Sequence, residues 1–257
     1  MAEPPRQLPL ELPHEAALGR DDYLVGASNK AAYELLERWP DWPSPVVVLA
    51  GPVGSGKTHL VQAFQDESAA CVVAAPDLAE HMVDALATAP AAVVENAHLG
   101  VDNTALFHLL NASRQAGKTV LITSRTWPAS WKLSLPDLMS RLRAATPVEI
   151  LEPDDDLLRR VLVKLFADRQ ISVDIGVVDY LVVRMERSLD VAMRAVEAID
   201  QEALAGRVKI TKPLAGRVLE DVHKGRCGRV LRHWFDLTAA LTVLLPFQGS
   251  TARITSA

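Results

Sequence analysis

The feature that most constrains this chain is the segment Gly51-Pro52-Val53-Gly54-Ser55-Gly56-Lys57-Thr58, which follows an apolar run at residues 46–50 and opens an amphipathic stretch. It has the form G-x-x-x-x-G-K-T. In such a strand, loop and helix context, glycines let backbone N–H groups curl around phosphate oxygens, and the helix start adds its positive dipole end. Lys57 then reaches the β and γ phosphates, and the Thr58 hydroxyl binds Mg²⁺. The segment therefore predicts a nucleotide-binding loop.

Short apolar runs alternate with helical patterns between residues 21 and 152. The runs cover residues 46–50, 71–75, 91–94, 119–123 and 148–151. Strands that are buried on both faces have this composition, and their alternation with helices indicates a parallel sheet. The predicted fold class is α/β, with helices flanking the sheet. Cys71, in the second run, is expected to be a small core residue.

The pattern changes to helices alone after Pro153. Apolar residues recur at helical spacing over residues 157–166 and again over residues 189–199, and Thr211 with Pro213 marks the start of a shorter helix. We therefore expect an extended arm at residues 1–20, an α/β domain at 21–152 and a small all-α lid domain at 153–222. Residues 223–257 form a tail to which the sequence assigns no role.

Charge and composition limit the partners that this chain can have. The net charge is −5, and the last 35 residues carry five Lys or Arg and one Asp, which leaves 22 basic and 31 acidic residues in the rest. A domain that binds DNA mainly through a basic surface is not expected. Two cysteines cannot make a disulfide framework. The first 19 residues do not resemble a secretory signal, and the longest apolar stretch, residues 237–247, is too short for a bilayer, so we expect a cytoplasmic protein without membrane partners.

A carboxylate that serves the metal ion should end another buried strand. Glu95 follows the run at residues 91–94 and fits this position, where phosphate-loop proteins usually place Asp. The next residue is Asn96, whereas many hydrolysing proteins of this kind have a second carboxylate that polarises the attacking water. An amide cannot accept that proton, so rapid ATP hydrolysis by the chain itself is not expected.

Several further segments carry a family resemblance. They are Asp22-Tyr23-Leu24-Val25-Gly26-Ala27-Ser28-Asn29, Thr123-Ser124, Leu135-Pro136-Asp137-Leu138-Met139-Ser140-Arg141-Leu142 and Glu186-Arg187-Ser188-Leu189-Asp190. With the phosphate loop, they resemble the AAA+ branch that contains the bacterial replication initiator DnaA, and most closely its shortened regulators, the DnaA inactivators of the Hda type. The resemblance covers the chain up to about residue 222.

The resemblance implies roles for individual residues. Tyr23 belongs to a segment that wraps the adenine, and Ser124 lies where the family places its sensor 1 side chain near the γ phosphate. Arg141 corresponds to an arginine finger that enters a neighbouring subunit's nucleotide site. Arg187 lies where the lid presents the sensor 2 arginine, although spacing alone does not choose between it, Arg184 and Arg194.

The arm also has a counterpart in the family. Residues 7–12, Gln-Leu-Pro-Leu-Glu-Leu, are similar to the peptide with which family members bind the replicative sliding clamp, the β subunit of DNA polymerase III. An extended peptide of this kind inserts Leu8, Leu10 and Leu12 into an apolar groove while the Gln7 amide makes directed hydrogen bonds.

Together these features imply a negative regulator of replication initiation. It would bind ADP or ATP with Mg²⁺ through Thr58 and Glu95, sit on a DNA-loaded clamp near the replisome, contact DNA only through that clamp, and use Arg141 to stimulate hydrolysis of DnaA-bound ATP. It could also form homo-oligomers. Two alternatives remain open, a helicase-loader-like ATPase that uses its own ATP cycle and a clamp-bound adaptor that stimulates nothing. The tail has no counterpart in the regulators, and we see no helix-turn-helix domain like the initiator's after residue 222.

Overall fold

The computed structural model describes residues 22–225. Its centre is one parallel sheet with the strand order β2-β3-β4-β1-β5. The strands are β1 (Val46–Ala50), β2 (Cys71–Ala74), β3 (Ala91–Glu95), β4 (Thr119–Ser124) and β5 (Thr146–Glu149). The three inner strands are almost entirely buried, as strands covered on both faces must be. The predicted α/β fold is confirmed.

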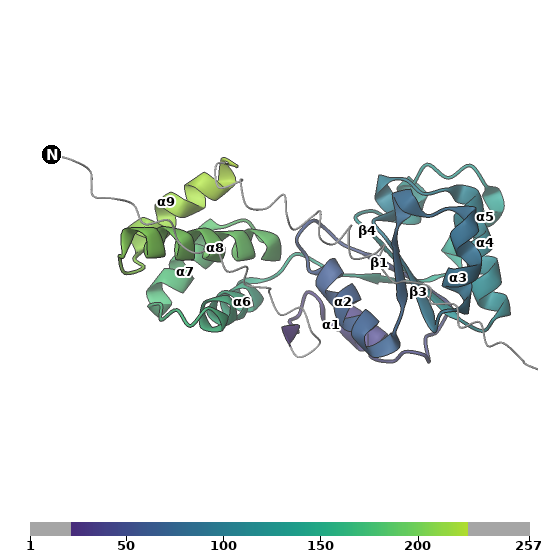
Figure 1. Ribbon diagram of the computed structural model, residues 1–257, viewed down its shortest axis with the longest axis horizontal. Coiled ribbons are helices and arrows are strands. Elements are labelled where there is room, and N and C mark those ends of the chain that lie inside the picture. Colours follow the sequence, from purple (N-terminus) through teal and green to yellow (C-terminus); the bar gives the residue numbers. More distant parts are fainter. Residues whose placement is uncertain (1–21, 226–257) are drawn as a thin grey trace, which may run out of the picture.

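Helices cover both faces of this sheet (Figure 1). Val47 and Leu49 of β1 pack with α1 (Lys30–Leu36) and α2 (Lys57–Ser68), whereas Val48 points to the opposite layer. That layer contains α3 (Val83–Thr88), α4 (Asn103–Gln115) and α5 (Pro136–Arg143). Short 3₁₀ helices join these elements: η2 (Ala75–Asp77), η3 (Glu80–Met82), η4 (Ala97–Leu99) and η5 (Pro128–Ser130). Because successive strand residues face opposite layers, two separate cores form.

Four helices follow the sheet and share a third core, which we call the helical unit. They are α6 (Asp155–Asp168), α7 (Ile175–Arg184), α8 (Leu189–Gly206) and α9 (Lys212–His223). Figure 1 shows them gathered at one end of the molecule, beside α1 and α2. Thr211 precedes α9 as predicted, with a proline in the first turn. Helix α7 was not predicted from the sequence.

Two predictions about the sheet edges were wrong in detail. The last strand begins at Thr146, two residues earlier than the apolar run suggested, and it contains Pro147. This strand pairs only with β1, so a residue without an N–H group is tolerated there. Cys71 begins β2 at the other edge and is exposed, so it is not a core residue. Edge strands lack the cover that buries inner strands.

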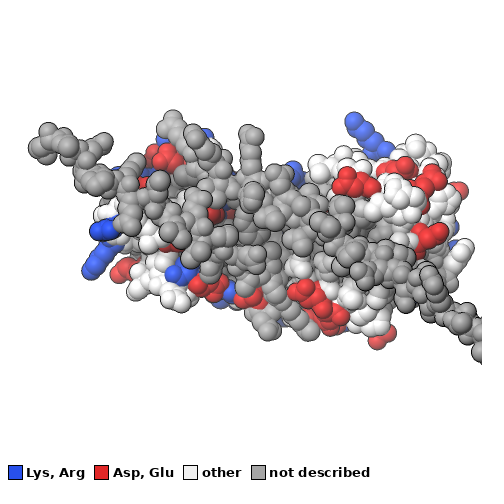
Figure 2. Space-filling view, viewed as in Figure 1, with Lys and Arg blue, Asp and Glu red and all other residues white. Residues whose placement is uncertain are grey.

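Acidic and basic side chains are scattered over the described part of one face (Figure 2). Figure 2 shows one face, on which the coloured acidic groups are spread over both ends of the molecule and the coloured basic groups form no continuous patch. Within residues 22–225, no helix is both long and apolar enough to cross a membrane.

Candidate functional site

The phosphate loop lies between the end of β1 and the start of α2. Gly54 and Gly56 have φ angles of +69° and +96°, a region that favours glycine. A Cβ atom at Gly54 would collide with the Ser188 hydroxyl, and one at Gly51 would meet the Ile150 carbonyl oxygen. The loop therefore has the curved, side-chain-free backbone that phosphate binding requires.

Lys57 is the first residue of α2 and is only 8% exposed. Its Nζ donates hydrogen bonds to the carbonyl oxygens of Gly51 and Pro52, at 2.7 and 2.8 Å. Burial lowers the pKa of Lys57 to about 8, and the positive charge of Arg125 adds to this, while Glu95 opposes it. The ammonium group thus lies against the same loop in which it is predicted to bind phosphate.

Glu95 and Thr58 meet beside this lysine. Glu95 is the last residue of β3 and is half-buried; the Thr58 side chain is hydrogen-bonded to it. Burial raises the pKa of Glu95, and the Thr58 hydrogen bond and the Lys57 charge act in the opposite direction. The two predicted metal-side residues are therefore adjacent. No group of three or more His, Cys, Asp or Glu in residues 22–225 could hold a metal by itself.

Asn96 follows Glu95 in a left-handed conformation, with φ +61° and ψ +41°. Asparagine tolerates this region better than most residues. Its backbone N–H donates to the Thr123 hydroxyl at 3.1 Å, which ties the end of β3 to β4. The position expected to carry a catalytic carboxylate is thus a fixed turn with an amide side chain.

The end of β4 lies directly against the phosphate loop. The Gly51 N–H donates to the Ser124 carbonyl oxygen at 3.2 Å. Ser124 is fully buried, and its hydroxyl accepts a hydrogen bond from the Thr126 N–H. Arg125, which the sequence analysis did not single out, is the first exposed residue after the strand.

The segment at residues 22–29 joins the helical unit to this site. Tyr23 is 7% exposed; its ring stacks on Tyr33 at 5.7 Å between centroids and meets the edge of His59 at 5.1 Å. Burial raises the pKa of Tyr23. Asp22 pairs with Lys164 of α6 at 2.7 Å. Tyr23 is thus placed beside α2 by contacts on both sides.

The start of α8 touches the phosphate loop. The Leu189 N–H donates to the Gly54 carbonyl oxygen at 2.8 Å, and the Ser188 hydroxyl, which caps α8, lies against Gly54. Sequence reasoning missed this contact, because nothing in a glycine-rich loop indicates which distant residues pack on it. The helical unit is therefore attached to the loop itself.

The three arginines considered for sensor 2 have different partners. Arg187 pairs with Asp155 at 2.9 Å, and both side chains are 54% exposed. Arg184 lies over the Tyr180 ring at 4.0 Å, and Arg194 pairs with Asp190 of its own helix at 2.9 Å. Of these, Arg187 directly precedes the two residues that contact the loop.

Arg141 lies on α5, away from these contacts. Its guanidinium is 5.2 Å from the centroid of the Phe107 ring in α4, and it forms no ion pair with any residue of the described range. The predicted clamp-binding peptide, with Gln7, Leu8, Leu10 and Leu12, falls outside the described residues.

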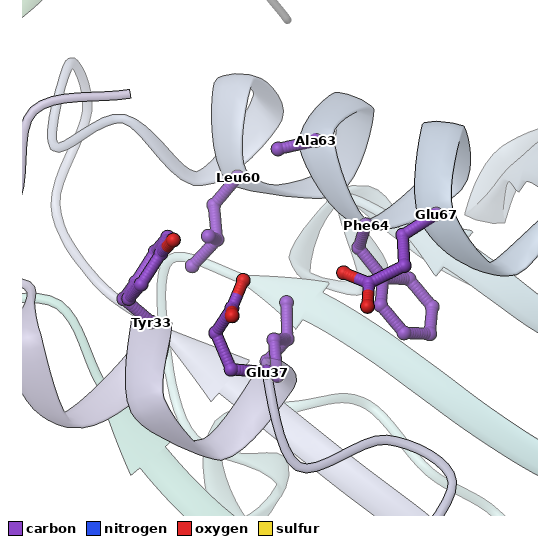
Figure 3. A pocket seen from close by; sticks show the side chains of 7 residues that line it. Tyr33, Glu37, Leu60, Ala63, Phe64 and Glu67 are labelled. Carbon is purple, nitrogen blue, oxygen red and sulfur yellow. The ribbon is translucent and has the colours of Figure 1, made fainter. Parts of the chain in front are cut away.

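A shallow hollow between α1 and α2 is not part of this site (Figure 3). Figure 3 shows the Glu37 and Glu67 side chains extending into the space between α1 and α2, near Leu60 and Phe64. The hollow is lined by Tyr33, Leu36, Glu37, Leu60, Ala63, Phe64 and Glu67. None of these residues was predicted to bind nucleotide.

Known proteins resemble this chain in sequence and in fold. No family model matches the sequence. The chain is 25% identical over 228 residues to an uncharacterized protein of Haemophilus influenzae, covering 83% of this chain and 98% of that protein. It is 26% identical over 186 residues to DnaA of Aquifex aeolicus, covering 63% and 46%. The chain is DnaA-like in sequence.

Solved structures give the fold. Domain III of Thermotoga maritima DnaA matches with a TM-score of 0.68 at 18% identity, over 79% of this chain and 96% of that one. AMPPCP-bound DnaA from Aquifex aeolicus matches with a TM-score of 0.61 at 21% identity, over 72% and 65%. The DnaA-like chain has the AAA+ fold of that domain. It spans about half the length of the DnaA relative, and the finer assignment to the inactivator branch stays a prediction.

The phosphate-loop contact leads to a stability prediction for this DnaA-like chain. Gly54→Ala should lower the free energy of unfolding by about 2 kcal/mol or more, because alanine is strained at positive φ and its methyl group collides with Ser188. Gly117→Ala is the matched control, since Gly117 has φ +67° but open space around it, and should lose only about 1 kcal/mol. Chemical denaturation measures both. If both variants lost the same free energy of unfolding, the collision with Ser188 would not contribute to the effect of Gly54→Ala.

Proposed function

We propose that the chain binds an adenine nucleotide at the phosphate loop and acts as a negative regulator of the replication initiator DnaA. One observation supports the nucleotide site most strongly. The loop with glycines at positive φ, the Lys57 ammonium group and the hydrogen-bonded Thr58 and Glu95 side chains all lie together. Glycines leave the backbone N–H groups accessible to phosphate oxygens, and the Thr58 hydroxyl and Glu95 carboxylate suit Mg²⁺ that is also held by phosphate.

The regulatory role is supported by the contrast between Asn96 and Arg141. The chain's own site lacks a carboxylate at position 96 that could take a proton from water. Arg141 is held by an aromatic ring and has no carboxylate partner in the described range, so its guanidinium remains available to a phosphate on another protein. We propose that Arg141 completes the ATP site of a bound DnaA, while the arm with Gln7 to Leu12 holds the chain on a DNA-loaded clamp.

Bound nucleotide would then have a structural role. The loop contacts Ser188 and Leu189, so its conformation is linked to that of the helical unit. The ion pair between Arg187 and Asp155 is exposed, so it contributes little to the stability of the fold. Arg187 can therefore leave the Asp155 carboxylate and bind a phosphate of the nucleotide instead. In this proposal the bound nucleotide holds the helical unit in one orientation, and the chain does not use a cycle of ATP hydrolysis to move it.

The chain's own turnover distinguishes this proposal from a loader ATPase. We expect the purified chain to retain bound nucleotide and hydrolyse ATP slowly, at a rate that single-stranded DNA and Asn96→Ala leave unchanged. A radioactive ATP assay measures this, with Lys57→Ala as the background. Rapid turnover that depends on Lys57 and rises with single-stranded DNA would favour the loader and contradict the structural nucleotide.

A further inference from the structure

The helical unit has one end at the phosphate loop and another end on the far side of α8. Helix α8 begins at the loop with Leu189 and is 18 residues long. The start of α7 lies at the far end, because a Cβ atom on Gly176 would be 3.2 Å from the side chain of Lys212, the first residue of α9. We call residues 169–176 and 204–212, which form this far end, the end surface.

The end surface leaves three large apolar side chains exposed. Ile175 is 59% exposed, Leu204 60% and Val208 52%, whereas the apolar stripes of α7 and α8 are packed in the shared core. Leu204 and Val208 are close together where α8 ends, and there the Arg207 N–H donates to the Leu204 carbonyl oxygen. Exposed apolar side chains that gather in one place, with polar residues around them, are typical of interaction sites.

The charge of the end surface is positive. It contains four basic residues, Arg169, Arg207, Lys209 and Lys212, and one acidic residue, Asp174. The Asp174 carboxylate already accepts a hydrogen bond from the Gly176 N–H at 2.7 Å, where it caps α7. An apolar surface that is rimmed by positive charge is complementary to a peptide that carries both apolar and acidic side chains.

The chain enters the described range beside this surface. Asp22 pairs with Lys164 at 2.7 Å, and the same lysine pairs at 2.7 Å with Asp168, the last residue of α6. Residues 1–21 are thus joined to the helical unit about one helical turn before the end surface begins. Leu12 is ten positions before Asp22, and ten residues can span up to about 33 Å, several times the roughly 8–10 Å between packed helices. The arm is therefore long enough to reach the end surface.

The arm also has the matching composition. Residues 7–15 contain the three leucines of the predicted clamp-binding peptide and two glutamates, Glu11 and Glu15, but no Lys or Arg. The other segment outside the described range, residues 226–257, carries four Arg and one Asp, so the positive end surface repels it. Charge therefore favours the arm over the tail as the occupant.

We propose that residues 7–15 of the chain's own arm dock on the end surface when no clamp is bound. The leucines cover the exposed apolar side chains, and the two glutamates lie among the basic residues of the surface. The end surface and the clamp compete for the same leucines, so clamp binding releases the end surface. This competition rests on the proposed function, whereas the docking itself does not.

Photo-cross-linking of the full-length chain tests the docking. A benzoylphenylalanine in place of Leu10 should cross-link to the end surface within one molecule, as mapped by mass spectrometry. Lys209→Glu combined with Lys212→Glu should lower the yield of this cross-link about 5-fold or more, because like charges then face each other. Adding Glu11→Lys and Glu15→Lys to that variant should restore the yield.

Two exposed basic residues of the α/β domain provide the matched control. Arg114→Glu combined with Lys132→Glu changes the net charge by the same amount but lies away from the end surface. This variant should keep the wild-type yield. Thermal unfolding of each variant shows whether the fold is kept.

The apolar part of the end surface is tested through the clamp. Leu204→Ser combined with Val208→Ser should lower the cross-link yield and tighten clamp binding about 5-fold, because the docked fraction of the arm lowers its apparent affinity for the clamp. Val183→Ser is the control, since Val183 is 76% exposed but lies near the other end of α7. It should change neither the cross-link nor clamp binding.

The outcomes separate the docking from the proposed function. Cross-links that map elsewhere, or that keep their yield in Lys209→Glu combined with Lys212→Glu, would overturn the docking. Cross-links between two molecules that increase with protein concentration would overturn it in favour of a second copy's arm. If the arm cross-linked to the end surface as expected but the chain did not bind the clamp, the docking would stand and the proposed clamp tether would be wrong.

Discussion

Lys57→Ala is expected to weaken the binding of ATP and ADP by about 100-fold or more. The side chain is predicted to contact two phosphates, and each charge-assisted hydrogen bond contributes about 1.5–3 kcal/mol. Its helix position and burial hold the ammonium group at the loop, where it already donates to the Gly51 and Pro52 carbonyls. Calorimetry or displacement of a fluorescent nucleotide measures the loss.

Lys118→Ala is the control for this change. Lys118 lies just before β4, at the amino ends of the strands, whereas the phosphate loop lies at their carboxyl ends. Its nucleotide affinity should match the wild type. Unfolding curves must accompany both variants, since Lys57 also satisfies buried carbonyl groups. If folded Lys57→Ala bound nucleotide as tightly as the wild type, the loop would not be the binding site.

The lowered pKa of Lys57 adds a pH dependence to the same prediction. In the free protein the ammonium group loses its proton near pH 8, whereas phosphate binding favours the charged form. Nucleotide affinity should therefore fall between pH 7 and pH 9 in the wild type. Lys57→Arg keeps its charge over this range, so its affinity, although different, should not show that fall. A wild-type affinity that stays constant to pH 9 would contradict the assigned role of the ammonium group.

Arg141→Ala is expected to remove the stimulation of DnaA-bound ATP hydrolysis and leave the chain's own nucleotide affinity unchanged. Arginine fingers contribute about 10³ or more to rates in other phosphoryl-transfer systems. Arg141 packs on the Phe107 ring and makes no ion pair in the described range, so its removal should cost little stability. Arg143→Ala, in the last turn of the same helix, is the control and should stimulate normally. A finger variant that stimulates like the wild type would contradict the proposal.

Much of the fold could be predicted because inner parallel strands leave a clear signal. The residues of β1, β3 and β4 are buried on both faces, so they appear as unbroken apolar runs. The edge strands gave a weaker signal, which is why the start of β5 was placed too late and Cys71 was assigned to the core. Helix α7 was missed although Asp174 caps it and Val177, Val178, Leu181 and Val182 form its buried stripe.

The site was predictable where a residue acts through local backbone geometry. The glycines at 54 and 56 have the positive φ angles that the loop motif implies, and Lys57 starts the helix as expected. The contact of Ser188 and Leu189 with the loop, and the position of Arg125, depend on tertiary packing between elements that are distant in sequence. A periodicity argument contains no information about such pairs, so only the structure could reveal them.

The most direct test of the central claim is hydrolysis of ATP that is bound to DnaA, measured with the wild-type chain and with clamp loaded on DNA. The proposal predicts stimulation that requires the loaded clamp, that is lost in Arg141→Ala, and that is lost in Gln7→Ala combined with Leu10→Ala. If the wild-type chain bound the clamp but DnaA-bound ATP was hydrolysed no faster, the chain would not be an activator of DnaA hydrolysis, and an adaptor or loader role would replace this one.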